Sequence, residues 1–299
     1  MQLGVGLVFS SCMWSEFCPA KLNLYLAVTR RREDGFHDLV SVVVKTSLGD
    51  TLEARLSEGE CDTLACSDEA LSCGPDNLVL KAAAAYRAEV SDAPFLSFNL
   101  VKRVPYGAGL GGGSSDAAAA LRIMNRACSE RLDIEALRGL AARVGSDCPL
   151  FLMDGAVVMR GRGDVLTPVP AASQKCFEGR GVIIVKPHFG IATGWAYSSL
   201  ASAGALIDPV VADAEIADWL MRDSLPPLRN SFQTLVYDKY PCYEVLNARF
   251  AQLGLPVLSL TGSGSAAFAF CSSLEADGMQ GIVRESFGKG AFVQYADII

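Results

Sequence analysis

The chain carries a glycine-rich run between Pro105 and Asp116, which reads Pro-Tyr-Gly-Ala-Gly-Leu-Gly-Gly-Gly-Ser-Ser-Asp and is followed by four alanines. Glycine loses more conformational freedom on folding than any other residue, so five glycines in seven positions indicate a loop that needs bare backbone. Bare backbone lets several N–H groups surround an anion, and Ser114 or Ser115 is expected to cap a helix that begins at Asp116. The run therefore predicts a phosphate-binding loop at a helix N-terminus, with a flexible linker as the alternative.

Three familiar nucleotide-binding motifs do not fit this loop. The spacing of Gly107, Gly109 and Gly112 matches the dinucleotide fingerprint, but that unit usually opens a chain and this loop comes a third of the way along. A P-loop needs Gly-Lys followed by Ser or Thr, and the protein-kinase set needs a Val-Ala-Ile-Lys strand and a His-Arg-Asp loop; neither is present. The loop is therefore a phosphate site of another kind, to which Lys102 and Arg103 add positive charge.

A second group of polar residues lies on a strand that we expect over residues 20–28. Strict alternation places Lys21, Asn23 and Tyr25 on one face of this strand and three leucines on the other. A polar face on a strand that is otherwise apolar indicates a functional role.

The elements that must position these residues fall into two groups. Before residue 171, the patterns predict strands over 39–46, 50–56, 95–104, 156–159 and 165–169 and helices over 77–90 and 132–144. Beyond it, they predict a strand over 181–186, helices over 214–221, 231–237 and 243–253, strands over 257–261 and 266–271, a helix over 279–287 and a strand over 291–295. This βαββαβ order predicts a ferredoxin-like second domain. A hinge is expected near 168–175, between a domain of residues 1–170 and a domain of residues 171–299.

Composition narrows the class of protein. A net charge of −7 over 299 residues argues against a nucleic-acid partner, and the expected partner is a small molecule. The ten cysteines contain no Cys-x-x-Cys pair, and only two histidines accompany them, so we expect reduced thiols in a cytoplasmic protein. The expected oligomeric state is a monomer or a weak homodimer.

The N-terminus gives no sign of export. Residues 1–11 are apolar but lack the basic start and cleavage site of an export signal, and Met13 is an alternative first residue. No segment reaches the length of a membrane span.

The glycine run resembles the second motif of the GHMP kinases. Together with four further motifs, it closely resembles one family of that superfamily, the 4-diphosphocytidyl-2-C-methyl-D-erythritol kinases, in which the five motifs occur in the same order. The four further motifs are Pro19-Ala20-Lys21-Leu22-Asn23-Leu24, Asp34-Gly35-Phe36-His37-Asp38-Leu39, Gly145-Ser146-Asp147-Cys148-Pro149 and Thr261-Gly262-Ser263-Gly264-Ser265. The resemblance implies an α+β, two-domain architecture, with an N-terminal α/β domain similar to ribosomal protein S5 and a C-terminal ferredoxin-like domain. It also implies ATP-dependent phosphorylation of the 2-hydroxyl of a cytidine-diphospho sugar alcohol in the non-mevalonate isoprenoid pathway.

The resemblance also assigns catalytic roles. Phosphoryl transfer needs a group that orients the attacking hydroxyl or takes its proton. Asp147 occupies the place of the family's catalytic aspartate, in a Gly-x-Asp-x-Pro turn, although a lone aspartate there would more often be a simple turn residue. Lys21 would keep that carboxylate ionised, since a nearby cation favours the charged form.

Substrate and nucleotide contacts are implied in the same way. Phe36, where tyrosine is common, would stack on the cytosine, and His37 would hydrogen-bond to it. Tyr197 would cover the opposite face of the base, with Trp195 as the alternative. Further substrate contacts are expected from Asn23, Thr193, Gly262 and Ser263. The ATP-binding residues implied are Asn77, which could equally cap a helix, Lys102, Pro105, Gly107, Gly109, Leu110, Gly111, Gly112, Gly113, Ser114 and Ser115.

The expected metal is Mg²⁺, which ATP would carry mainly on its phosphates. Ser115 is the one candidate ligand. The superfamily often adds a glutamate about eleven residues before the base, but that position is Ala136, with Glu135 beside it, so a direct glutamate ligand is not expected. Two alternatives stay open at this point: another small-molecule kinase of the superfamily, acting on homoserine or mevalonate, and a nucleotide-binding regulator without catalytic activity.

Overall fold

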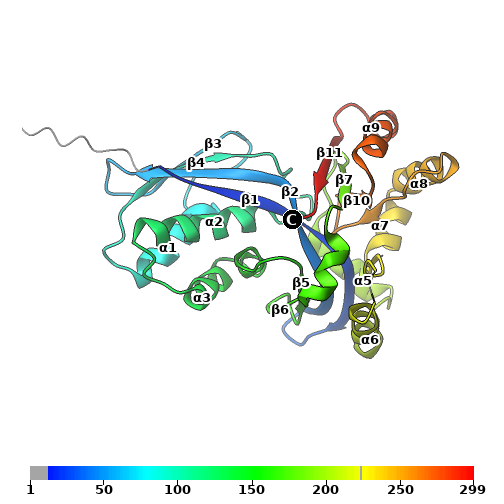
Figure 1. The fold of residues 1–299 in the computed structure, drawn as a ribbon, viewed down its shortest axis with the longest axis horizontal. Coiled ribbons are helices and arrows are strands. Elements are labelled where there is room, and N and C mark those ends of the chain that lie inside the picture. The colour runs from blue at the N-terminus through cyan, green and yellow to red at the C-terminus, as the bar shows by residue number, and fades with distance from the viewer. Residues whose placement is uncertain (1–12, 223) are drawn as a thin grey trace, which may run out of the picture.

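The computed structural model describes residues 13–222 and 224–299, so the expectations for residues 1–12 lie outside the described residues (Figure 1). The larger sheet has seven strands, in the order β3-β4-β2-β1-β8 with β5 beside β2 and β6 beside β5. Its strands are β1 Met13–Arg31, β2 His37–Leu56, β3 Thr63–Cys66, β4 Leu96–Val101, β5 Val157–Arg160, β6 Val165–Pro168 and β8 Arg229–Asn230. The long antiparallel pair of β1 and β2 forms the spine of this sheet and reaches both halves of the molecule.

Two strands that were expected to be separate form one continuous strand. The predicted strands over 39–46 and 50–56 are both parts of β2, which continues through Ser47, Leu48 and Gly49. These residues are typical of a turn, but β1 runs alongside them and the pairing continues from Pro19 opposite Gly49 to Cys18 opposite Asp50. The ladder to β1 therefore overrides the local turn preference.

Helices cover one face of this sheet (Figure 1). They are α1 Leu78–Glu89, α2 Gly112–Ala127, α3 Ile134–Val144 and the short 3₁₀ helix η1 Cys148–Leu152. The alanines of α2, Ala117 to Ala120, are fully buried, because small side chains let this helix pack closely on β1 and β2.

The start of α2 differs from the expectation. The prediction that Ser114 or Ser115 caps a helix beginning at Asp116 is wrong, since α2 begins at Gly112 and Gly111 is its N-cap residue, with a φ of 72° and no side-chain cap. A left-handed residue at this place favours glycine. The first turn of α2 therefore keeps its backbone N–H groups free of any capping side chain. Asn77 does cap its helix, because its side chain accepts from Val79 N at 2.9 Å.

The second sheet has the order β11-β7-β10-β9 with antiparallel neighbours, which is the ferredoxin-like arrangement predicted. Its strands are β7 Gly181–Lys186, β9 Ser259–Leu260, β10 Ala267–Phe270 and β11 Phe292–Asp297, and its helices are α5 Thr193–Ser202, α6 Pro209–Leu220, α7 Gln233–Lys239, α8 Cys242–Gln252 and α9 Ser273–Phe287. The helix α5 was not expected from the sequence. In the predicted hinge, the chain forms two short helices, α4 Ala171–Gln174 and η2 Lys175–Phe177.

The two sheets share part of their hydrophobic core. Leu22 of β1 belongs to the same buried cluster as Val182 of β7 and Phe268 of β10. In addition, β8 lies beyond residue 171 yet pairs with β1 of the first sheet. The boundary between residues 170 and 171 stays a prediction. None of the helices in residues 13–222 and 224–299 combines the length and the apolar character that crossing a bilayer requires.

Candidate active site

The polar face of β1 is interrupted by a bulge. The register to β2 shifts between Asn23 and Tyr25, so the alternation of side chains reverses there. Lys21 and Asn23 line a large cavity, and beyond the bulge Leu26 lines it too. The prediction that Tyr25 shares the face of Lys21 is therefore wrong: Tyr25 is buried in the core on the other side, where its hydroxyl donates to Glu215 Oε2 at 2.7 Å.

Lys21 and Asn23 are held in place by a buried hydrogen-bond network. The Lys21 ammonium donates to Asn23 Oδ1, and Asn23 Nδ2 donates to Ser41 Oγ at 2.8 Å. The backbone N–H of Asn23 donates to Thr261 Oγ1 at 2.8 Å, which connects β1 to the Thr261–Ser265 turn of the second sheet. Both side chains therefore have defined positions before any ligand binds.

Asp147 faces the same cavity from the N-cap position of η1. Its side chain makes no capping hydrogen bond, so the carboxylate is not used by the helix. Burial lowers the pKa of the Lys21 ammonium, and the negative charge of Asp147 acts in the opposite direction. The two groups are therefore coupled by charge across the cavity, although they form no direct ion pair among those of the described residues.

The glycine run fits tightly between β1 and η1. Lys21 N donates to Leu110 O at 2.9 Å. A Cβ atom on Gly111 would lie 2.8 Å from the Phe151 ring and 3.0 Å from Lys21 Cγ, and contacts under 3.0 Å are too close for a side chain. Glycine at this position thus lets the glycine run touch both the strand that carries Lys21 and the helix that begins after Asp147.

Two cavities meet at this loop. The larger has a volume of about 910 Å³ and contains Lys21, Asn23 and Asp147. The smaller, of about 490 Å³, is lined by the glycine run, Asn77 and Lys102. Three loop residues line both cavities: Gly109, Gly111 and Ser114. A group transferred between ligands in the two cavities would therefore pass beside this part of the loop.

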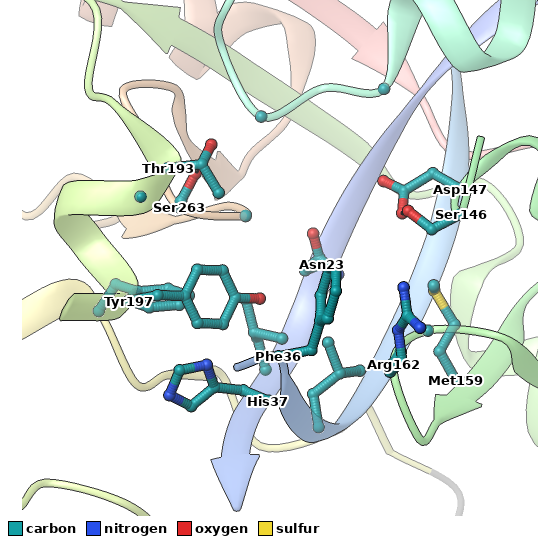
Figure 2. Close-up of a pocket in the computed structure, with 18 of the residues that line it drawn as sticks. Asn23, Phe36, His37, Ser146, Asp147, Met159, Arg162, Thr193, Tyr197 and Ser263 are labelled. Carbon is teal, nitrogen blue, oxygen red and sulfur yellow. Dashed lines mark hydrogen bonds between the residues drawn. The ribbon is translucent and has the colours of Figure 1, made fainter. Parts of the chain in front are cut away.

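Figure 2 shows Tyr197 and His37 at the end of the larger cavity that lies away from Asp147, with Phe36 between them and Arg162. The rings of His37 and Tyr197 lie 5.0 Å apart, and the Phe36 ring is half exposed, with the Arg162 guanidinium 3.8 Å from its centroid. Burial raises the pKa of Tyr197 to about 12, so its phenol stays neutral. Trp195 does not line the cavity; its ring packs against Lys239 instead.

His37 lines this space and has an unpartnered nitrogen. Its Nε2 atom is buried and has no hydrogen-bond partner. Burial and the positive charge of Arg31 lower the pKa of His37, so its imidazole is neutral near pH 7. A neutral imidazole can either donate or accept, as recognition of a heterocyclic base requires. Above Tyr197 in Figure 2, Thr193 Oγ1 and Ser263 Oγ lie 3.2 Å apart.

In the smaller cavity, Lys102 is not a free cation. Its ammonium lies between the carboxylates of Asp50 and Asp116, two buried residues. Burial lowers the pKa of Lys102, but the two carboxylates together outweigh burial and raise it. Asp50 also accepts hydrogen bonds from the backbone N–H groups of Arg103 and Val104. The cluster therefore joins β2, the start of the glycine run and α2, and anchors both ends of the loop.

The two loop serines differ in their surroundings. Ser114 lines both cavities, whereas Ser115 is 1% exposed and lines neither. The Ser115 hydroxyl is nevertheless one of the few buried polar groups with no partner. Burial raises the pKa of the Cys148 thiol to about 11, with a hydrogen bond to Ser114 acting in the opposite direction, so the loop also contacts η1 through side chains.

Several residues of the larger cavity were not identified from the sequence, among them Arg31, Ser146, Met159 and Arg162. Arg31 and Arg162 come from opposite ends of the first half of the chain, on β1 and in the turn between β5 and β6. Only Ser146 had a local signal, because it lies beside Asp147 in the same motif. The others reach the cavity through sheet pairing over long sequence distances, since β5 pairs with β2.

Comparisons with known proteins agree with this geometry. Residues 77–155 match the model of the GHMP kinases N terminal domain. A relative from Synechococcus sp. (strain CC9902), named 4-diphosphocytidyl-2-C-methyl-D-erythritol kinase, is 38% identical over 84% of this chain and 85% of its own. A relative of the same name from Solidesulfovibrio magneticus is 36% identical over 84% of this chain and 86% of its own.

Solved structures give the same result. A crystal structure of 4-(cytidine 5'-diphospho)-2C-methyl-D-erythritol kinase superimposes with a TM-score of 0.76 at 29% identity, covering 95% of this chain and 99% of that chain. The mevalonate kinase of Methanococcus jannaschii shares the fold alone, with a TM-score of 0.69 at 13% identity over 98% of this chain and 99% of its own. The chain belongs to the 4-diphosphocytidyl-2-C-methyl-D-erythritol kinase family of the GHMP kinases.

Proposed function

We propose that this enzyme transfers the γ-phosphoryl group of ATP to the 2-hydroxyl of 4-diphosphocytidyl-2-C-methyl-D-erythritol, giving the 2-phosphate and ADP, as a step of the non-mevalonate isoprenoid pathway. The observation that carries the proposal is the junction of the two cavities. One cavity has a recognition end, lined by Phe36, His37 and Tyr197, and a catalytic end, lined by Lys21 and Asp147. This cavity meets the phosphate loop, which also lines the second cavity.

In this mechanism Asp147 is the general base. The half-buried carboxylate is not used in capping η1, so it can accept the proton of the 2-hydroxyl as the oxygen attacks phosphorus. Lys21 stabilises the ionised form of Asp147 and orients the hydroxyl, with Asn23 fixing the position of the ammonium. The proton moves from the substrate to Asp147, and the leaving group is ADP.

Recognition of the cytosine falls to the aromatic end of the cavity. Phe36 and Tyr197 would stack on the two faces of the base, and His37 Nε2, buried without a partner, would hydrogen-bond to its edge. Thr193, Gly262 and Ser263 line the same cavity near the turn of the second sheet and would contact the rest of the substrate. The substrate would thus span the distance between Tyr197 and Asp147.

ATP would occupy the smaller cavity, with its phosphates on the glycine run. The backbone N–H groups at the uncapped start of α2 suit an anion, and residues 105–114 line the cavity together with Asn77 and Lys102. The Asn77 side chain is already used as a helix cap, so its contact with the nucleotide would be through the remaining surface of the residue.

Mg²⁺ bound to the ATP phosphates would neutralise the charge that develops during transfer. The unpartnered Ser115 hydroxyl fits a single oxygen ligand, and Ser114 offers a second hydroxyl from the cavity wall. The described residues contain no group of three or more His, Cys, Asp or Glu that could hold a metal ion. This donor set suits an ion that the nucleotide brings in, with only one or two protein oxygens.

The test is a comparison of acceptors. ATP turnover by the full chain is measured with 4-diphosphocytidyl-2-C-methyl-D-erythritol, mevalonate and homoserine, and phosphorus NMR locates the new ester. We expect kcat/KM for the cytidine compound to exceed the others by at least about 100-fold, with the phosphate on the 2-hydroxyl. Preference for mevalonate or homoserine, or a phosphate on another hydroxyl, would show that the assignment is wrong.

A further inference from the structure

The 3₁₀ helix that follows Asp147 ends in a cluster of cations. The last carbonyl groups of a helix have no partner within the helix. Here the carbonyl of Phe151 accepts from Arg122 Nη2, that of Leu152 accepts from Arg138 Nη2 at 3.4 Å, and that of Met153 accepts from the Lys45 ammonium. Three consecutive carbonyls are thus bound by cations from three different elements, β2, α2 and α3.

Lys45 is the most deeply placed of these cations. Its residue is only 8% exposed, and in the register of β1 and β2 it lies directly opposite Lys21. Directly opposite residues of an antiparallel pair project to the same face of the sheet. One pair of backbone partners therefore supplies both the lysine at the candidate reaction centre and the lysine that holds the far end of η1.

None of these cations touches the substrate space. Among the described residues that line the two cavities, Lys45, Arg122 and Arg138 are absent, whereas Asp147 lines the larger one. Any effect of Lys45 on the reaction must therefore pass through η1. This helix has only five residues, Cys148–Leu152, so a shift at Met153 moves Asp147 as well.

We propose that Lys45, assisted by Arg122, is a positioning residue that fixes the Asp147-bearing turn relative to Lys21. This inference rests on the proposed role of Asp147 as the base. Misplacing a catalytic group by about 1 Å can reduce a rate by roughly 100-fold, which is why a fixed distance between the base and the lysine matters.

The charges around Lys45 keep its ammonium protonated at neutral pH, which the hydrogen bond to Met153 O requires. Burial lowers the pKa of Lys45 to about 8, with the Asp154 carboxylate opposing burial and Arg122 adding to it. Lys21 on β1 is its direct neighbour, and Arg138 on α3 binds the adjacent carbonyl. Lys45 is therefore mostly protonated near pH 7, when it donates to Met153 O.

The test uses kinetics with ATP and the cytidine substrate. Lys45→Met and Arg122→Met should lower kcat by roughly 10- to 100-fold while both KM values stay within about twofold, because the binding surfaces are untouched. Lys45→Arg, which keeps a cation at this site, should recover part of the lost rate. Arg126→Met is the matched control for Arg122→Met, because Arg126 lies on the same helix and pairs with the same Glu16 but makes no hydrogen bond or ion pair with η1 among those of the described residues. Its kcat should equal that of the wild type.

A double variant separates positioning from general damage. In an Asp147→Asn background, Lys45→Met should cause no further loss of the residual rate, since the base through which it acts is gone. A full additional loss in that background, an unchanged kcat in both Lys45→Met and Arg122→Met, or an effect confined to the KM for ATP would overturn the proposal.

Hydrogen exchange provides a readout that does not depend on the reaction. Backbone amides of residues 148–153 should exchange faster in Lys45→Met and Arg122→Met than in the wild type, while those of α9 stay unchanged.

If the wild type does not phosphorylate the cytidine substrate, or Asp147→Asn keeps the full rate, the proposed function fails. The exchange data still decide whether Lys45 fixes this turn, and unchanged exchange in both variants would mean that it does not. If Lys45→Met does not fold, Arg122→Met decides the question alone.

Discussion

Gly109 and Gly262 pack backbone against backbone: a Cβ atom on Gly262 would lie 3.0 Å from the Gly109 carbonyl oxygen, and a Cβ on Gly109 would lie 3.0 Å from the Thr261 carbonyl oxygen. A hydrogen bond of 3.1 Å from Ala266 N to Ala108 O supports the same contact. The turn of the second sheet and the glycine run of the first half are therefore packed together. Through this contact, the wall of the larger cavity, proposed for the substrate, touches the wall of the smaller cavity, proposed for ATP.

This contact predicts that Gly262→Ala affects both substrates. Gly262 has a φ of 57°, and the new methyl group would meet backbone atoms that cannot rotate away. We expect a stability loss of about 1–3 kcal/mol and a rise in KM for ATP as well as for the cytidine substrate. Gly278→Ala in α9, where a Cβ would meet nothing within 4 Å, is the control. Matching melting temperatures and KM values for the two variants would contradict the prediction.

The proposed base predicts a large effect for Asp147→Asn. The amide keeps the size of the side chain but cannot accept the proton, so kcat should fall by roughly 10²- to 10⁴-fold. ATP affinity measured by calorimetry should stay within about twofold of the wild type, because Asp147 lines only the larger cavity. Asp133→Asn serves as the control, since Asp133 caps α3 through a hydrogen bond from Ala136 N that asparagine can replace. Equal turnover of the two variants would rule out Asp147 as the base.

Some of the site could be anticipated from contiguous motifs. The glycine run and Lys21 stood out by residue type and spacing, whereas His37 and Asp147 were singled out only through the resemblance of their motifs to the family. The structure brings all of them around adjoining cavities, and their roles stay predictions. What the sequence could not reveal depends on contacts between distant segments. The bulge that turns Tyr25 into the core arises from the register of β1 against β2.

The same explanation applies to the start of α2 and to the missed helix. Ser114 and Ser115 have the residue types of helix caps, yet α2 begins at Gly112, after the left-handed Gly111, which has no room for a side chain beside Phe151 and Lys21. Helix α5 is rich in small and aromatic residues and has no apolar stripe of its own, so packing against α7 stabilises it rather than its sequence pattern.

The proposed cytosine site predicts a selective effect for Tyr197→Ala. Stacking of an aromatic ring on a base is worth about 1–3 kcal/mol, so KM for the cytidine substrate should rise roughly 10- to 100-fold while KM for ATP changes little. Tyr197→Phe should behave like the wild type, because the ring is kept. Trp195→Phe is the control on the same helix, since Trp195 lies outside the cavity. Equal changes in both KM values for Tyr197→Ala would reject the stacking arrangement.

The buried cluster under the glycine run predicts a pH-dependent stability. Burial raises the pKa of Asp116 from 3.8 to about 7, even though the Lys102 ammonium lies beside it. A carboxyl group whose pKa is raised in the folded state favours folding at low pH, and this contribution is lost as the pH rises from about 4 to about 7. Asparagine does not titrate, and Lys102 would keep Asp50 as its partner.

Asp116→Asn should therefore be more stable than the wild type at pH 8, by about 1–3 kcal/mol, and nearly equal to it at pH 4. Melting temperatures measured at half-unit intervals from pH 4 to pH 8 should show the difference growing up to about pH 7 and then levelling off, because the folded carboxyl is fully ionised above that point. Asp208→Asn keeps an exposed helix cap that accepts from Val210 N and is the control outside this cluster. A constant difference for Asp116→Asn, or a loss of stability at pH 8, would mean that the ionised Asp116 carboxylate stabilises the loop and that Lys102 requires both of its partners.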